Sequence, residues 1–286
     1  MNSYALILLA DVLLTADFAL QKQYQRKAGV SARAGLIFNG LLGLFAAVIF
    51  FIINGFQLHF SLYSLIMAAA MSVLCMLYVF VGFRILKDGN MALYTLFLMT
   101  GGMTIPYLWG TLFLNEEITV LRTLGLVLII GAIVFSNLGA KRPNKTQLIL
   151  CICVFFFNGF VSVISKMHQI NTVYEPVSAG EFVFWTAVIK FVICSCALLF
   201  MKKEPLPSKP TVLLPIIFCS ALANGLSYLC QLIGAANLPA TLLYPLVTGG
   251  CVILSPIMGW LVYKEKLSVY QWAAIGICAV GTCLFL

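Results

Sequence analysis

Thr100-Gly101-Gly102 opens an apolar run that ends at Glu116-Glu117, and Thr248-Gly249-Gly250 opens a second run that ends at Lys264-Glu265. The interval from Gly102 to Gly250 equals the interval from Glu117 to Glu265, so both copies have the same length between these marks. A chain that repeats one pattern in each half is expected to contain two related structural units. In membrane proteins, such internal duplication is typical of transporters.

The composition indicates an integral membrane protein. Charged residues are 9% and hydrophobic residues 62% of the 286 residues, whereas about 25% of the residues of a typical soluble protein are charged. The net charge of +8 does not indicate nucleic-acid binding, because the basic residues lie in short clusters between apolar runs. Such clusters set the topology and face anionic lipid.

A membrane-spanning helix needs about 20 apolar residues. This length predicts an all-α membrane protein of ten transmembrane helices, at about 3–21, 34–54, 60–83, 90–113, 119–139, 147–166, 179–201, 211–235, 238–262 and 268–286. The first segment is longer than the core of a signal peptide and holds two aspartates, so we expect it to be retained.

The polar segment Lys141-Arg142-Pro143-Asn144-Lys145 separates two units, residues 1–140 and 146–286, with five predicted helices each. Matching segments end the first helix and open the second helix of each unit: Lys22-Gln23-Tyr24-Gln25 with Lys166-Met167-His168-Gln169, and Ser31-Ala32 with Ser178-Ala179. Because five is an odd number, the second unit must cross the membrane upside down. We therefore expect two inverted five-helix repeats.

Basic residues are distributed unevenly between the two ends of the predicted bundle. One end has only Arg122 and Lys166. The other end has Lys22, Arg26, Lys27, Arg33, Arg84, Lys87, Lys141, Arg142, Lys145, Lys202, Lys203, Lys209, Lys264 and Lys266. The positive-inside rule makes the richer end cytoplasmic, which predicts that both termini are outside the cell, in a plasma-membrane protein.

The ten helices, the five-plus-five inverted repeat and the Glu-containing turns before Gly-rich helices resemble the EamA-like branch of the drug/metabolite transporter superfamily. The likeness covers essentially the whole chain and is clearest in residues 100–136 and 248–286. The family's Leu-Gly-Glu-Arg turn is matched in part by Leu114-Asn115-Glu116-Glu117 and Tyr263-Lys264-Glu265-Lys266. The resemblance implies alternating access to a central cavity lined mainly by helices 1, 3, 6 and 8, together with 4 and 9. It also implies cytoplasmic termini, opposite to the charge count.

Two predicted helices carry polar stripes at helical spacing. Asn224, Tyr228 and Gln231 follow one face of helix 8, and Asn158 and Ser162 begin such a face on helix 6, which continues to Ser165 and Gln169. Lipid offers no hydrogen-bond partners, so these stripes should face protein or water. They either join helices or line the substrate cavity. Tyr94 and Tyr244, which precede the two Thr-Gly-Gly segments, either stack on a substrate or belong to the interfacial aromatic belt.

Three ionisable residues are predicted to lie within the membrane: Asp11, Asp17 and Lys190. A charge near mid-bilayer costs about 3 kcal/mol on insertion scales, so such residues usually have a function. Asp17 lies about 120° around the helix from Asp11, so the two cannot form one paired-carboxylate site. An Asp–Lys pair that fixes packing is one interpretation. Binding of the substrate or of a coupling proton or ion, preferably at Asp11, is the other.

Other motifs have mainly structural interpretations. Glu181, Glu117 and Glu265 each lie near the start of a predicted helix, where a carboxylate suits the exposed amides. The glycines of the two Thr-Gly-Gly segments, with Pro106, Pro245 and Pro256, indicate either close helix packing or hinges. With two histidines and no phosphate-binding loop, the sequence predicts no enzyme, no metal site and no cofactor.

The function favoured by these features is secondary transport of a small organic metabolite, with cationic or zwitterionic solutes such as amino acids or amines preferred. The alternatives are a polytopic membrane enzyme acting on lipid, and a carrier of nucleotide sugars or phosphorylated anions. The expected partners are the small-molecule substrate, a coupling proton or ion and membrane lipid, with no nucleic acid. The expected state is a monomer or homodimer.

Overall fold

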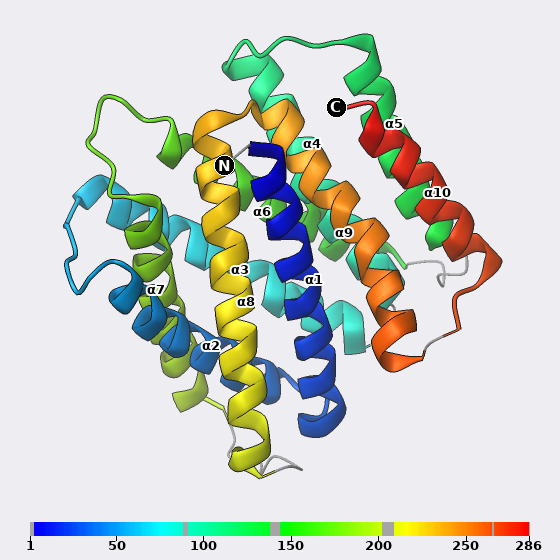
Figure 1. Ribbon diagram of the computed structural model, residues 1–286. Coiled ribbons are helices and arrows are strands. Elements are labelled where there is room, and N and C mark those ends of the chain that lie inside the picture. The colour runs from blue at the N-terminus through cyan, green and yellow to red at the C-terminus, as the bar shows by residue number, and fades with distance from the viewer. Residues whose placement is uncertain (1–2, 88–90, 138–143, 202–208, 265, 286) are drawn as a thin grey trace.

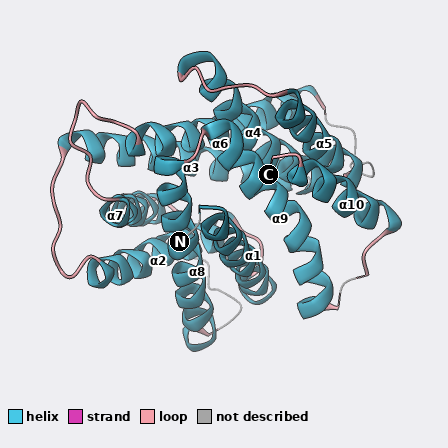
Figure 2. Cartoon of the chain, turned by 45° about the horizontal axis from the view of Figure 1, so that its top comes forward, coloured by secondary structure: helices cyan, strands magenta, loops and turns pink. Residues whose placement is uncertain are grey.

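The computed structural model describes residues 3–87, 91–137, 144–201, 209–264 and 266–285. Within these residues all regular secondary structure is helical (Figure 2). The ten helices are α1 (Ser3–Ala28), α2 (Ala32–Ile53), α3 (Leu62–Lys87), α4 (Met91–Phe113), α5 (Val120–Ser136), α6 (Lys145–Gln169), α7 (Ala179–Leu199), α8 (Pro210–Asn237), α9 (Ala240–Tyr263) and α10 (Val269–Cys283).

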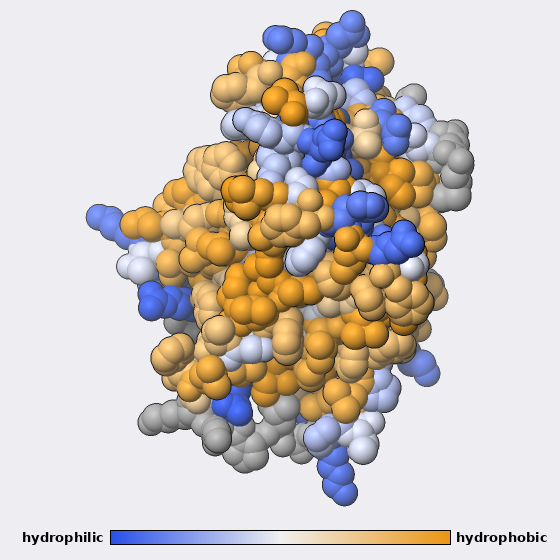
Figure 3. Space-filling model, turned by 90° about the vertical axis from the view of Figure 1, so that its left-hand side faces the viewer, coloured by the Kyte–Doolittle hydropathy of each residue, from blue (hydrophilic) through white to orange (hydrophobic). Residues whose placement is uncertain are grey.

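The predicted ten-helix membrane fold is confirmed. Eight helices are long and apolar enough to cross a membrane, and α5 and α10 are shorter apolar helices of 17 and 15 residues. α1 continues past the predicted end to Ala28, so Lys22, Arg26 and Lys27 lie on its last turns rather than in a connection. Large apolar side chains cover the middle of the face in Figure 3, as expected for an integral, multi-pass membrane protein surrounded by lipid.

The helices pack in pairs drawn from the two halves of the chain. α2 packs on α7, α4 on α9, and α5 on α10, which lie side by side at one edge (Figure 1). α1 packs on α8 and α9, and α6 packs on α3 and α4. Both termini lie at the same end of the bundle (Figure 1).

Polar side chains set the start of several helices. Ser31, Thr119, Asn144, Ser178 and Ser268 each accept a hydrogen bond from a backbone N–H in the first turn of α2, α5, α6, α7 and α10. These caps satisfy amides that a helix start leaves without a partner. In α7 the cap is reciprocal, because Glu181 in the first turn accepts from the backbone N–H of Ser178 at 2.9 Å.

Glu117 precedes α5 as predicted, but its carboxylate is not the N-cap of that helix. The Thr119 hydroxyl caps α5, and Glu117 is exposed. Its neighbour Glu116 instead binds the start of α9, accepting hydrogen bonds from the backbone N–H groups of Ala240 and Thr241 at 2.7 and 2.8 Å. A carboxylate suits a helix N-terminus, but this helix is distant in sequence.

The two acidic turns also differ by one residue in register. The residue with left-handed backbone after α4 is Asn115, with φ 51°, and after α9 it is Lys264, with φ 53°. The interval from Gly102 to Asn115 is one residue shorter than the interval from Gly250 to Lys264. The equal spacing of the two sequence patterns therefore does not hold at the turn. Glu265 lies outside the described residues.

Lys166 lies near the end of the sixth helix as predicted, but it does not face the surface of the bundle end to which the charge count assigned it. It belongs to α6, is buried, and donates hydrogen bonds to the backbone carbonyls of Ala235 and Leu238, each at 2.7 Å. A cation suits these carbonyls because they lie at the C-terminal end of α8, where the helix dipole is negative. The turn between α8 and α9 is therefore bound by Lys166 of α6 and by Glu116 of the connection between α4 and α5.

Candidate functional site

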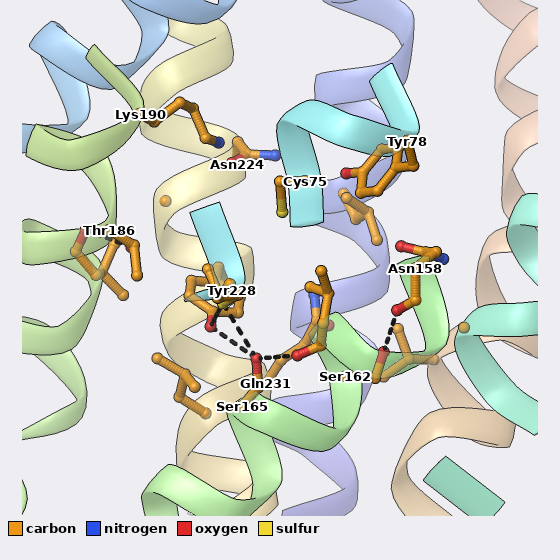
Figure 4. A pocket seen from close by; sticks show the side chains of 18 of the residues that line it. Cys75, Tyr78, Asn158, Ser162, Ser165, Thr186, Lys190, Asn224, Tyr228 and Gln231 are labelled. Carbon is orange, nitrogen blue, oxygen red and sulfur yellow. Dashed lines mark hydrogen bonds between the residues drawn. The ribbon is translucent and has the colours of Figure 1, made fainter. Parts of the chain in front are cut away.

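Two adjoining cavities occupy the interior of the bundle. The central cavity has a volume of about 330 Å³ and is lined by residues of α1 to α4 and α6 to α9 (Figure 4). The second, here called the α1–α2 cavity, has a volume of about 260 Å³ and reaches the turn at Gly29, Val30 and Ser31. Both are lined by Phe18, Leu42, Tyr78, Leu98, Lys190 and Asn224, so they meet across these residues.

Most of the site residues predicted from the sequence lie on these cavities. The central cavity is lined by six of them: Asn158, Ser162, Asn224, Tyr228, Gln231 and Tyr244. The α1–α2 cavity is lined by Asp17, Tyr94 and Asn224. The polar stripes of α6 and α8 therefore face each other across a common space. They also join helices, because the hydroxyls of Ser165 and Tyr228 share a hydrogen bond of 2.8 Å.

The three amide side chains of the central cavity bind the protein through their nitrogens. Asn158 donates to the Leu98 carbonyl at 2.8 Å, Asn224 to the Asp17 carboxylate at 2.8 Å, and Gln231 to the Ser227 hydroxyl at 3.2 Å. With the amides in this orientation, none of their three carbonyl oxygens accepts a hydrogen bond from another described residue. These oxygens are acceptors at the cavity wall.

Asp17 and Lys190 bring opposite charges to the α1–α2 cavity. The Asp17 carboxylate is 4% exposed and accepts hydrogen bonds from Ser220 and Asn224 of α8. Within the described part of the chain, no carboxylate oxygen lies within 4 Å of the Lys190 ammonium. The predicted Asp–Lys packing pair is therefore not a direct ion pair, although both groups face one space.

Asp11 lies apart from the other predicted site residues. It lines neither cavity and is 3% exposed in the contact between α1 and α9, where its carboxylate packs against Gly250. Its Oδ1 atom is buried without a hydrogen-bond partner, as is the Thr15 hydroxyl one turn later. Asp11 and Asp17 thus face different surroundings, as their angular separation predicts.

Glycines of the Thr-Gly-Gly segments permit close helix contacts. A Cβ atom on Gly101 would collide with the Phe155 backbone, and one on Gly102 would lie 2.6 Å from the Asn158 amide nitrogen. On α9, a Cβ on Gly250 would collide with Asp11. Of the two sequence interpretations, close packing accounts for these positions.

The end of the bundle opposite the α1–α2 turn is tightly packed. His168 is fully buried, shares a 2.9 Å hydrogen bond with Ser64, and stacks on Phe182. Ser64 also accepts from the backbone N–H of Val177 at 3.0 Å. Closer to the cavity, Tyr244 donates to the Ser162 carbonyl at 2.6 Å. The interior space therefore extends toward one end of the bundle.

Sequence reasoning did not assign several cavity residues to the site. Lys190, Tyr78, Cys75 and Thr186 all line the central cavity. The implied role of helix 3 was a usable signal for Tyr78 and Cys75, which are three residues apart and share a face of that helix. Thr186 and Lys190 are four residues apart on α7, a spacing that also indicates one face. No trio of His, Cys, Asp or Glu suited to a metal ion occurs within the described ranges.

Comparison with known proteins identifies a family for the second half of the chain. Residues 145–286 match the model of the EamA-like transporter family. Twenty-eight chains of solved structures match this chain. One of them, described only as the crystal structure of a protein, has a TM-score of 0.78 and 12% sequence identity, over 99% of this chain and 95% of that chain. At that identity the likeness concerns the fold alone. No curated protein sequence matches the chain.

Proposed function

Because residues 145–286 belong to the EamA-like transporter family, we propose that this membrane transporter of the drug/metabolite type carries a zwitterionic or cationic metabolite by alternating access. The substrate binds in the central cavity and reaches it through the α1–α2 cavity. The observation that carries the substrate class is that Asp17 and Lys190 line one cavity without forming a direct ion pair.

An amino-acid-like solute matches this pair of charges. Its ammonium group is attracted by the Asp17 carboxylate, and its carboxylate pairs with the Lys190 ammonium. Such pairs are strong in a site that excludes water. The remaining substrate occupies the central cavity, whose wall includes Leu14, Met71 and Val247. Apolar walls with a few placed polar groups are typical of small-molecule sites.

The amide oxygens favour a solute that donates hydrogen bonds. Asn158, Asn224 and Gln231 each have a carbonyl oxygen that no other described residue uses. An ammonium group offers three N–H donors and no acceptor, so it can satisfy such oxygens. The ring faces of Tyr78 and Tyr228 at the same cavity add sites where a desolvated cation is attracted.

Alternating access is supported by the difference between the two ends of the bundle. The cavities extend to Gly29–Ser31 at one end, whereas His168, Ser64 and Phe182 pack together at the other. The pairing of α1 with α8 and α9, and of α6 with α3 and α4, supports two inverted repeats, residues 1–140 and 146–286, that rock against each other. We further propose that the protein lies in the plasma membrane. The distribution of its basic residues then orients both termini toward the outside of the cell.

Uptake into proteoliposomes that contain the purified protein tests this function. The probes are labelled leucine, isoamylamine, which lacks the carboxylate, and isocaproate, which lacks the ammonium group. Leucine should enter fastest, and loss of either charged group should lower the initial rate about 10-fold or more, because one lost charge-assisted contact is worth at least 1.4 kcal/mol. Absence of protein-dependent uptake for a panel of labelled amino acids and amines would refute the proposed substrate class.

The second candidate is a carrier of phosphorylated anions, which the position of Lys190 on both cavities favours. In the same vesicles, uptake of a labelled sugar phosphate without uptake of leucine would support this candidate. Conversion of added phospholipid without solute uptake would instead indicate a lipid-modifying enzyme.

A further inference from the structure

Asp11 and Asn158 make matching contacts in the two halves of the chain. Asn158 of α6 packs against Gly102 of α4, and Asp11 of α1 packs against Gly250 of α9. The interval from Asp11 to Asn158 equals the interval from Ser31 to Ser178, the caps of the next helices. Each polar residue therefore faces the second glycine of one Thr-Gly-Gly segment, at equivalent positions of the proposed repeats.

The two contacts differ by one hydrogen-bond donor. The Asn158 amide donates to the carbonyl of Leu98, four residues before Gly102, at 2.8 Å. The equivalent acceptor on α9 is the carbonyl of Leu246, four residues before Gly250. An ionised carboxylate has no N–H or O–H to donate, and Asp11 Oδ1 is buried without a partner. A protonated carboxyl group has the shape of an amide and one O–H donor.

No cation compensates Asp11 from the helices packed against α1. The described sequences of α8 and α9 contain no Asp, Glu, Lys, Arg or His. Their titratable side chains are the thiols and phenols of Cys219, Tyr228, Cys230, Tyr244, Cys251 and Tyr263. Cys251 follows Gly250 directly, and the other acid on α1, Asp17, has its own donors in Ser220 and Asn224. An unpaired carboxylate in this position is costly, and binding a proton removes its charge.

We propose that Asp11 is a proton-binding site in the contact between α1 and α9, separate from the substrate cavity. The proton comes from water, forms an O–H bond on the Asp11 carboxylate, and is donated in a hydrogen bond to the Leu246 carbonyl, as the Asn158 amide N–H is donated to Leu98. When α1 and α9 separate, water reaches the carboxyl group and the proton leaves as hydronium. The use of this proton in transport rests on the proposed function, but its binding does not.

Infrared spectroscopy of the purified protein in lipid vesicles tests the site without any transport substrate. The wild-type protein should show the C=O stretching band of one protonated carboxyl group at neutral pH, shifted in deuterium oxide. Asp11→Asn should remove the band. Asn158→Asp should about double its area, because it creates the same arrangement on α6 and α4. Asp17→Asn should leave the band, since Asp17 accepts two hydrogen bonds as a carboxylate.

Absence of the band from the wild-type protein, its survival in Asp11→Asn, or its loss in Asp17→Asn would overturn the proposal. Asp11→Asn should fold, because asparagine already occupies the equivalent contact, and size-exclusion chromatography checks this. If that variant does not fold, the wild-type, Asp17→Asn and Asn158→Asp spectra still decide the assignment. Failure of uptake for the whole panel of labelled amino acids and amines, with the band present, would refute the proposed substrate class and leave the proton site standing.

Discussion

Replacement of Glu116 should destabilise the protein although Glu116 belongs to neither cavity. α9 begins after Pro239, which supplies no side-chain cap, so the amides of its first turn need an acceptor from elsewhere. The Glu116 carboxylate provides one oxygen to Ala240 N–H at 2.7 Å and the other to Thr241 N–H at 2.8 Å. Glu116→Ala removes both hydrogen bonds at once.

The magnitude follows from the type of contact. Replacing a helix N-cap by alanine costs about 0.5–2 kcal/mol of stability. The cost of Glu116→Ala should be near the upper end of this range, because both oxygens of Glu116 accept charge-assisted hydrogen bonds. A loss of about 2 kcal/mol lowers the melting temperature by about 4–8 °C in a protein of a few hundred residues. Glu116→Gln retains one acceptor oxygen, so about half of that decrease is expected.

Thermal unfolding in detergent, followed by size-exclusion chromatography of the heated protein, measures the effect. Glu117→Ala is the matched control, because the adjacent carboxylate is exposed and an exposed substitution usually changes stability by less than about 0.5 kcal/mol. Equal decreases for Glu116→Ala and Glu117→Ala, or no decrease for Glu116→Ala, would show that the cap on α9 does not contribute as described.

Three further predictions address the site, the helix contacts and the topology. Lys190→Met should raise the leucine concentration for half-maximal uptake about 10-fold or more and leave the corresponding isoamylamine concentration nearly unchanged. The reason is that leucine has a carboxylate that pairs with the Lys190 ammonium, whereas isoamylamine has none. Equal effects on both solutes would contradict the assignment. Gly101→Ala should cost about 1–3 kcal/mol of stability through collision with the Phe155 backbone, whereas Gly131→Ala, where a Cβ meets open space, should be neutral or slightly stabilising. Tags at both termini should react with a membrane-impermeant reagent on intact cells, and reaction only after permeabilisation would reverse the proposed orientation.

The ten helices could be predicted because each requirement is local. A run of about 20 apolar residues is both necessary and nearly sufficient for a membrane-spanning helix. The ends were less predictable, as α1 shows. Its predicted end at residue 21 marks the first charged cluster, but Gln, Lys and Arg are good helix formers and Tyr24 and Ala28 pack in a hydrophobic cluster, so the helix continues to Ala28. Apolar length therefore predicts that a helix exists better than it predicts where the helix ends.

The candidate site was partly predictable for a related reason. Spacing within one helix places Asn224, Tyr228 and Gln231 on a shared face, and the structure brings that face to the central cavity. Spacing also separates Asp11 from Asp17, but it cannot say which of the two faces meets the cavity. That depends on how α1 is rotated against α8 and α9. Asp17 lines the α1–α2 cavity, and Asp11 lies in the helix contact.

Glu116 and Lys166 show which information the sequence lacks. Their partners are backbone groups of the α8–α9 turn, distant in sequence, and backbone groups have no residue-specific signal. The proposed internal repeat supplies part of what is missing. Once the contact between Asn158 and Gly102 is known, the repeat interval points to Asp11 and Gly250 as its counterpart. A difference between such counterparts, here an amide against a carboxylate, then marks a position where the two proposed repeats differ in chemistry although the helix contact is alike.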